Sequence, residues 1–283
     1  MLSLAGSLSG SGRCHAVTVR ERYSHGHHDS VLRSHRWRTA ANSAGFLLAE
    51  LRPGLDVLDV GCGPGTISID LARRVPGGRV VGIDRSFEAV VAARQAAGAA
   101  AVPVTFETGD AYQLPFPAGT FDVVHAHQVL QHLADPVAAL REMRRVCRPG
   151  GLVAARDADY AAMAWYPPEP ALDRWLDLYC RVARANGGEP AAGRRIAFWA
   201  GSAGFERVTP SVSTWLFASE GDRAWWGGTW AERMTTSDVA ARAVELGEAT
   251  PGELAELAAG WRRWAATPDG WFAVLHGEVL CRT

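Results

Sequence analysis

The sequence contains no lysine, so all 29 of its Lys and Arg positions are arginine. A chain without lysine cannot form a Schiff base with a substrate, and it cannot supply the lysine that contacts phosphate in a P-loop. Composition alone therefore excludes these two kinds of site.

Long apolar runs and an excess of either charge are also missing. No apolar stretch approaches the roughly 18 residues that a membrane-spanning helix needs. The formal net charge is −1, which gives nucleic acid little electrostatic reason to bind. We expect a small-molecule partner, no nucleic acid, no membrane span, and a monomer or homodimer.

Cysteine is scarce, with five residues scattered along 283 positions. Their number is odd and their spacing matches neither a metal site nor a disulfide framework. A reducing cytoplasm suits this pattern. Residues 1–16 are rich in Ser and Gly and lack the charged and apolar parts of a signal peptide, so they predict a disordered tail.

What the chain does have is a glycine-rich stretch, VLDVGCGPGTISIDLA, at residues 57–72. Its pattern predicts a buried parallel strand, a turn with glycines at 61, 63 and 65, and a helix. Such a turn lets the backbone approach a ligand closely. Residue 66 is Thr, where a dinucleotide fingerprint has its third glycine. The carboxylate of Asp59 suits a ligand with an ammonium group better than a pyrophosphate.

Strands and helices alternate over residues 55–157, which predicts a doubly wound parallel sheet. We expect strands at 55–60, 79–83, 103–107, 121–126 and 151–157, with helices near 66–75, 86–97 and 135–147. Farther along, we expect helices at 169–186 and 190–203, a strand at 205–218, helices within 221–266 and a closing strand at 270–283.

Asp84 ends the second expected strand, where a carboxylate can accept hydrogen bonds from both hydroxyls of a ribose. A helix N-cap is the alternative role for Asp84, although Ser86 could cap the helix instead.

The stretch TGDAYQLPFPAGTFDVVHAHQVLQHLADP, residues 108–136, decides between cofactor classes. It resembles the pattern G-D-A-x-x-L-P-F-x-x-x-x-F-D-x-V of class I S-adenosylmethionine-dependent methyltransferases, and the glycine stretch resembles their motif I. The likeness covers about residues 45 to 160 and is closest to the ubiquinone/menaquinone-type small-molecule enzymes. It implies a Rossmann-like α/β fold with a seven-stranded, mostly parallel sheet and helical cap insertions.

The same resemblance implies S-adenosylmethionine as cofactor and suggests which residues hold it. Asp110 would accept from the adenine amino group, and His127 and Gln128 would face the methionine portion. The full expected cofactor set is Asp59, Gly61, Gly63, Gly65, Asp84, Arg85, Gly109, Asp110, Ala111, His127 and Gln128.

Candidates for catalysis come from a narrower likeness. Some phosphobase methyltransferases pair an N-terminal lid Tyr with a His, and Tyr23 and His132 match those positions. His127 is a further candidate base. Three histidines at 25, 27 and 28, with His35, have no partner cysteines, so we expect a polar lid segment over the cofactor and no metal.

Ten of the eleven tryptophans lie between residues 165 and 271, which suggests a pocket for a planar or apolar acceptor. Candidate acceptor residues are Trp37, Trp165, Glu169 and Arg194. The expected division of the chain is a tail at 1–16, a helical lid at 17–50, a cofactor-binding core at 51–159, a helical cap insertion with a return helix at 160–204, and a last segment at 205–283 with a cap insertion at 221–266.

These features predict methyl transfer to oxygen or carbon of a small metabolite. Two other readings stay open. One is a protein that keeps this fold as a binding module or for a non-methylating reaction. The other is a nicotinamide oxidoreductase, which Thr66 and the 108–136 stretch disfavour.

Overall fold

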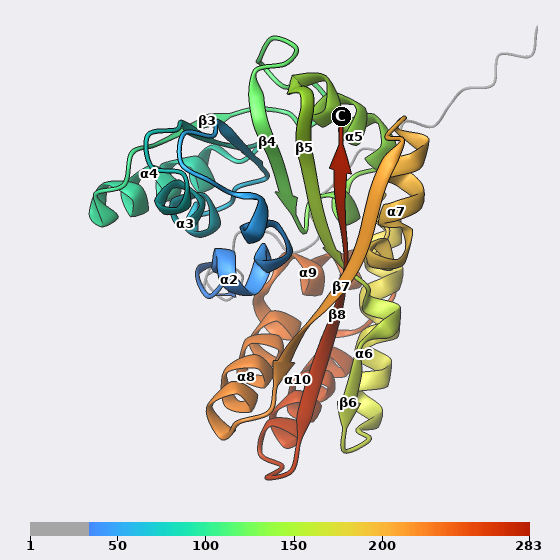
Figure 1. The fold of residues 1–283 in the computed structure, drawn as a ribbon. Coiled ribbons are helices and arrows are strands. Elements are labelled where there is room, and N and C mark those ends of the chain that lie inside the picture. Colours follow the sequence, from blue (N-terminus) through green and yellow to red (C-terminus); the bar gives the residue numbers. More distant parts are fainter. Residues whose placement is uncertain (1–33) are drawn as a thin grey trace, which may run out of the picture.

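Strands and helices alternate through the first half of the fold, as the sequence predicts (Figure 1). The computed structural model describes residues 34–283. The strands are β1 (Val57–Val60), β2 (Val80–Asp84), β3 (Val104–Thr108), β4 (Phe121–His127) and β5 (Cys147–Ala158). The helices between them are α3 (Thr66–Arg74), α4 (Phe87–Ala100) and α5 (Pro136–Val146).

The sheet has the strand order β3-β2-β1-β4-β5-β8-β6, and β7 also pairs with β8. The pairs among β1 to β5 are parallel, whereas β8 (Trp271–Arg282) runs antiparallel to its neighbours β5, β6 (Ala164–Tyr166) and β7 (Arg207–Phe217). The predicted doubly wound, mostly parallel sheet is thus confirmed. Sequence reasoning missed the three-residue strand β6, which is too short to show an alternating pattern.

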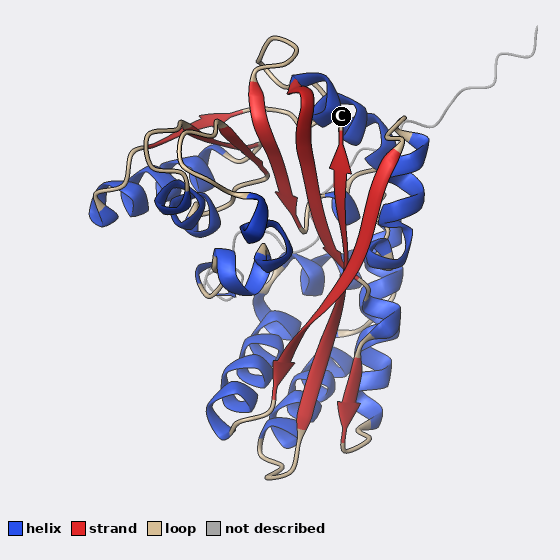
Figure 2. Ribbon diagram, in the orientation of Figure 1, coloured by secondary structure: helices blue, strands red, loops and turns tan. Residues whose placement is uncertain are grey.

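One end of β8 pairs with β5 and the other end pairs with β6, while β7 follows it throughout. Strands β7 and β8 therefore extend beyond the parallel part of the sheet (Figure 2). Around this extension lie α6 (Pro170–Ala185), α8 (Glu220–Thr236) and α10 (Pro251–Ala265), with α9 (Asp238–Glu245) nearer the sheet (Figure 1). Helix α7 (Ala192–Ser202) packs on β5 and β8.

Helix starts follow local capping chemistry. The Ser86 side chain accepts from the backbone N–H of Ala89 and begins α4, so Ser86 is the cap that leaves Asp84 for another role. Asp135 caps α5 directly before a proline at the first helical position. Ser219 and Asp222 form a capping box at α8.

Two kinds of core stabilise the molecule. Aliphatic side chains fill the space between the sheet and helices α3, α5 and α7. The core between the extension of β7 and β8 and helices α6, α8 and α10 is instead aromatic. Its tryptophans Trp175, Trp230, Trp261 and Trp264 are all less than 2% exposed. Each large ring buries about 150–250 Å² on folding. Most of the predicted tryptophan-rich region is therefore packing.

The expected N-terminal helical segment is only partly described. Residues 34–50 form short helical turns, among them α2 (Ala40–Ser43) and the 3-10 helix η1 (Gly45–Glu50). The backbone N–H of Ala40 donates to Asp70 of α3, which fixes α2 beside the glycine-rich strand-to-helix turn. Within residues 34–283, every helix is too short or too polar to cross a membrane.

Candidate functional site

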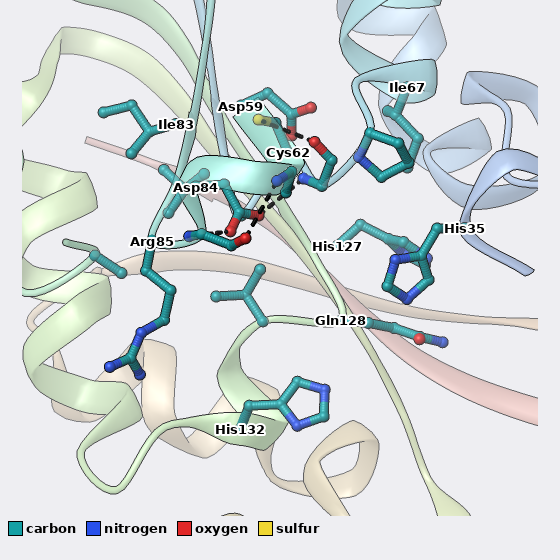
Figure 3. Close-up of a pocket in the computed structure, with 18 of the residues that line it drawn as sticks. His35, Asp59, Cys62, Ile67, Ile83, Asp84, Arg85, His127, Gln128 and His132 are labelled. Carbon is teal, nitrogen blue, oxygen red and sulfur yellow. Dashed lines mark hydrogen bonds between the residues drawn. The ribbon is translucent and has the colours of Figure 1, made fainter. Parts of the chain in front are cut away.

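A cavity of about 510 Å³ opens at the carboxyl ends of β1, β2 and β4 (Figure 3). In open α/β sheets this edge is where ligands bind. Its lining includes most of the residues that the sequence singled out: Asp59, Gly61, Gly63, Asp84, Arg85, Gly109, Asp110, Ala111, His127, Gln128 and His132.

The three glycines of the turn have different roles, although all have positive φ values. A Cβ on Gly63 would meet one atom within 4 Å, His35 Nδ1 at 3.8 Å, which is an ordinary contact distance. A Cβ on Gly61 would lie 2.3 Å from Val129 Cγ2. Gly65 does not line the cavity, because its missing Cβ faces Phe106 Cζ at 2.7 Å. The expected cofactor contact of Gly65 is therefore replaced by close helix-to-sheet packing.

Asp84 organises the glycine turn while facing the cavity. One carboxylate oxygen accepts from the backbone N–H of Gly63 at 2.9 Å, and the other accepts from Ser86 N–H at 2.9 Å. A carboxylate offers about four acceptor positions, so two remain for vicinal hydroxyls of a ligand. Figure 3 shows Asp84 beside Cys62, with its carboxylate hydrogen-bonded to the turn.

The opposite wall of the cavity comes from the loop after β3. Gly109 N–H donates to the carbonyl of Asp84 at 3.0 Å, which holds this loop against β2. Asp110 is exposed and accepts from Tyr112 N–H at 2.9 Å, and Ala111 lies beside it. This loop therefore presents a carboxylate next to small residues at the cavity mouth.

Asp59 lies deeper than expected, at 2% exposure. One of its oxygens lies 2.8 Å from His125 Nδ1, and the other accepts from the Ser68 hydroxyl. These bonds tie β1 to β4 and α3 beneath the turn. A direct contact between Asp59 and a ligand ammonium stays a prediction, and the structural role of this carboxylate is the one with observed partners.

Gln128 closes the other end of the cavity in an uncommon backbone conformation, with φ of 53°. Its amide oxygen accepts from Arg38 Nη2 at 2.8 Å, and its Nε2 lies 2.9 Å from His276 Nε2. His276 Nδ1 lies 3.0 Å from the carbonyl of Val274, so its Nε2 is free to accept from the amide. This network fixes the direction of the Gln128 side chain.

His127 and His132 at this end are neutral at pH 7. Burial, with Arg156 and Arg38 nearby, holds the pKa of His127 well below its usual 6.5. Burial and Arg38 lower the pKa of His132 to about 3. A low pKa makes an imidazole a weak base. These imidazoles can therefore donate and accept hydrogen bonds in their neutral form, but they are poor acceptors of a proton from a substrate.

Sequence reasoning missed His276, Arg156 and Glu278. Arg156, 1% exposed, donates to Glu278 at 3.1 Å and lies 5.0 Å from the Trp215 ring centre. Two of these residues could have been noticed in the sequence, because His276 and Glu278 interrupt the otherwise apolar stretch VLHGEVL of the closing strand.

The structure does not bring every predicted acceptor residue to the cavity. Trp165 stacks on Phe272 at 5.5 Å, Glu169 begins α6 and pairs with Arg263, and Arg194 pairs with Asp159. Trp37 lines a second, smaller cavity that also reaches Arg38 and Gln128. Tyr23 and the histidines at 25, 27 and 28 lie outside the described residues.

The lining fits S-adenosylmethionine in size and chemistry. Ligand pockets of about 300–1,000 Å³ are usual. The glycine turn gives close backbone approach, Asp84 suits a ribose, and Ile83, Ala111 and Val129 supply apolar walls. Phe87 stands at the cavity with 62% of its surface exposed.

Comparison with known proteins agrees with this geometry. Residues 58–155 match the family described as a methyltransferase domain. Over 268 residues the chain is 35% identical to an uncharacterized methyltransferase of Schizosaccharomyces pombe, covering 91% of this chain and 95% of that protein. The chain belongs to the class I S-adenosylmethionine-dependent methyltransferases.

This methyltransferase is also similar to a second curated protein and to a solved structure. It is 31% identical over 278 residues to the probable methyltransferase ltbC of Aspergillus luteorubrus, covering 91% of this chain and 96% of that one. The solved structure of the [4+2]-cyclase SpnF is 25% identical with a TM-score of 0.52, covering 85% of this chain and 79% of that chain. The family prediction is confirmed, and the nicotinamide oxidoreductase alternative is wrong.

Proposed function

We propose that this methyltransferase binds S-adenosylmethionine in the 510 Å³ cavity and methylates oxygen or carbon of a small, planar or apolar metabolite. The observation that carries the proposal is Asp84, whose carboxylate both holds Gly63 and faces the cavity. When bound, S-adenosylmethionine supplies a methyl group on a positively charged sulfur.

The residues of the chain then have to orient and enclose the reactants. Asp84 would accept from the ribose hydroxyls and Asp110 from the adenine amino group, while Gly63 would let the backbone approach. Gln128 lies at the end of the cavity opposite the Asp110 loop. Because Arg38 and His276 fix its amide, Gln128 would present one defined edge to the methyl acceptor.

The side chains of this site are poorly suited to remove a proton from the acceptor. The low pKa of His132, about 3, makes it a poor proton acceptor. An acceptor atom that is already deprotonated would need no base, so this site favours such an atom over a neutral alcohol. Tyr23 and His132 as a joined latch stay a prediction.

Calorimetric titration with S-adenosylhomocysteine tests the cofactor assignment. Asp84→Ala should weaken binding by about 1–3 kcal/mol, because ribose hydroxyls lose a half-buried acceptor and the turn loses its support. Asp135→Ala is the matched control, since Asp135 also accepts a hydrogen bond from a backbone N–H but does not line the cavity. Equal affinity in the Asp84 variant and the control would contradict the assignment.

A non-methylating reaction on the same scaffold is the second candidate function. The observation behind it is the similarity to a solved protein that is named as a cyclase. Product mass separates the two functions. Methyl transfer increases the mass of the acceptor by that of one CH₂ group and releases S-adenosylhomocysteine. A rearrangement leaves the mass of the substrate and that of S-adenosylmethionine unchanged.

A further inference from the structure

A second cavity adjoins the cofactor cavity beneath residues 34–38. Its rings are Trp37, Trp215, Trp225, Trp226 and Trp230, and we refer to it as the tryptophan cavity. His35, Arg38 and Gln128 line both cavities, so these residues form a wall that the two cavities share.

The rings of the tryptophan cavity pack against one another. Trp37 lies 5.3 Å from Trp225 at an angle of 34°, and 5.1 Å from Trp215 at 90°. Offset and edge-to-face contacts of this kind are those that a further aromatic ring can join. In its present form the cavity measures about 20 Å³, enough for one water molecule. Trp37 and Trp225 are only partly buried, so these are the rings that an acceptor would displace.

The polar groups of the tryptophan cavity are mainly hydrogen-bond donors. Trp226 is 5% exposed, and its indole N–H has no hydrogen-bond partner. An indole nitrogen can only donate, and a buried donor without an acceptor is costly. Arg233, 4% exposed, lies 5.0 Å from the centre of the Trp230 ring. Among the described residues that line the cavity, two are arginines and none is acidic.

We propose that the tryptophan cavity binds the methyl acceptor, and that this acceptor is a planar organic anion with its acid group against Trp226 and Arg233. The atom to be methylated, a deprotonated oxygen or carbon that needs no base, then lies at Gln128, at the wall that the two cavities share. A carboxylate would accept from the indole N–H and be held by the guanidinium, while its ring lies among the tryptophan faces. This inference rests on the methyl transfer proposed above.

Binding of three probes tests the proposal without knowledge of the natural acceptor. The probes are 2-naphthoate, 2-naphthamide and 2-naphthylmethylammonium, which share a ring system and differ in charge. Each is titrated calorimetrically into protein saturated with S-adenosylhomocysteine. We expect naphthoate to bind about tenfold more tightly than the amide, and the cation to bind most weakly. Equal binding of acid and amide, preference for the cation, or no binding of any probe would overturn the proposal.

A pair of conservative variants localises the effect. Trp226→Phe keeps an aromatic ring and removes the unpaired N–H, so the preference for naphthoate over naphthamide should fall severalfold. Trp261→Phe is the matched control, because the indole N–H of Trp261 is also buried without a partner but does not line the cavity. Arg233→Gln should abolish the preference, and Arg262→Gln, on an exposed face of α10, should retain it. The same preference in the Trp226 and Trp261 variants would refute the placement of the acid group.

The two proposals fail in different ways. If S-adenosylhomocysteine does not bind the wild-type protein, the cofactor assignment fails, and discrimination between acid and amide is then measured on the protein alone. If S-adenosylhomocysteine binds but the acid and the amide bind equally, only the proposal for the acceptor fails.

Discussion

Gly63 and Gly65 stand two positions apart in one motif, yet they face different neighbours. A Cβ on Gly65 would meet Phe106 Cζ at 2.7 Å and Ala93 Cβ at 2.9 Å, whereas one on Gly63 would meet only His35 Nδ1, at 3.8 Å. At the scale of single residues, this contrast separates a fold requirement from a ligand requirement.

We expect Gly65→Ala to lower the free energy of unfolding by about 1–3 kcal/mol through overpacking and backbone strain, with unchanged S-adenosylhomocysteine affinity of the folded protein. Gly63→Val should instead reduce that affinity, because its side chain enters the cavity. Urea unfolding and calorimetry on both variants provide the measurements. Loss of affinity in the alanine variant of Gly65, without loss of stability, would show that Gly65 contacts the cofactor after all.

At the scale of elements, the segment from Ser34 to Ser43 supplies wall residues to both cavities. The carbonyl of His35 accepts from the Thr66 hydroxyl at the glycine turn, and Ser34 accepts from Arg233 of α8. The Trp215 indole N–H of β7 donates to the carbonyl of Asn42 at 2.6 Å. A ligand in either cavity therefore touches a segment that also lines the other.

We expect amide hydrogen exchange in residues 34–43 to slow when S-adenosylhomocysteine binds, because the ligand restrains His35 and Arg38. Helix α10 serves as the internal control, since its residues do not line the cofactor cavity. Exchange in 34–43 that is the same with and without ligand would contradict a lid at this position. The predicted lid residues 17–33 are measured in the same experiment.

At the scale of the whole molecule, buried titratable groups set the pH dependence of stability. His127, His132 and His276 have pKa values below the usual 6.5, chiefly because of burial. The unfolded chain binds their protons more readily, so the stability from keeping them neutral is present above pH 6.5 and is lost as pH falls. Asp157 acts in the opposite direction, because burial raises its pKa to about 7. Its contribution is present below about pH 4 and is lost as pH rises to about 7.

Three imidazoles outweigh one carboxyl, so the free energy of unfolding should rise between pH 5 and pH 7. Asp157→Asn removes the opposing group and should make this rise steeper, by up to about 1.4 kcal/mol per pH unit. Urea unfolding of both proteins across this range is the measurement. Parallel pH curves for wild type and variant would rule out the raised pKa of Asp157.

Local patterns in the sequence were sufficient to predict most helices and strands and most residues that line the cofactor cavity. Alternating and helical periods, the proline and aspartate at the start of α5, and the glycines of the turn act over a few residues, so they can be read without the fold. Strands β1 to β5 and the cofactor cavity lie where these patterns predict. The same reasoning could not separate Gly63 from Gly65, because the neighbours that distinguish them, Phe106 and Ala93, come from other elements.

Only the tertiary structure decided how the remote segments meet. Gln128 and His276 are 148 positions apart, Arg156 and Glu278 are 122 apart, and Ser34 and Arg233 are 199 apart. No periodicity links such pairs. The first two contacts depend on the strand order that places β8 between β5 and β7, and the third depends on the packing of α8 against the segment before α2. For the same reason Trp165, Glu169 and Arg194 looked equivalent to Trp37 in the sequence. Packing of the aromatic core places Trp37 at the cavity and gives the other three structural partners, because burial and hydrogen bonding are properties of the assembled fold.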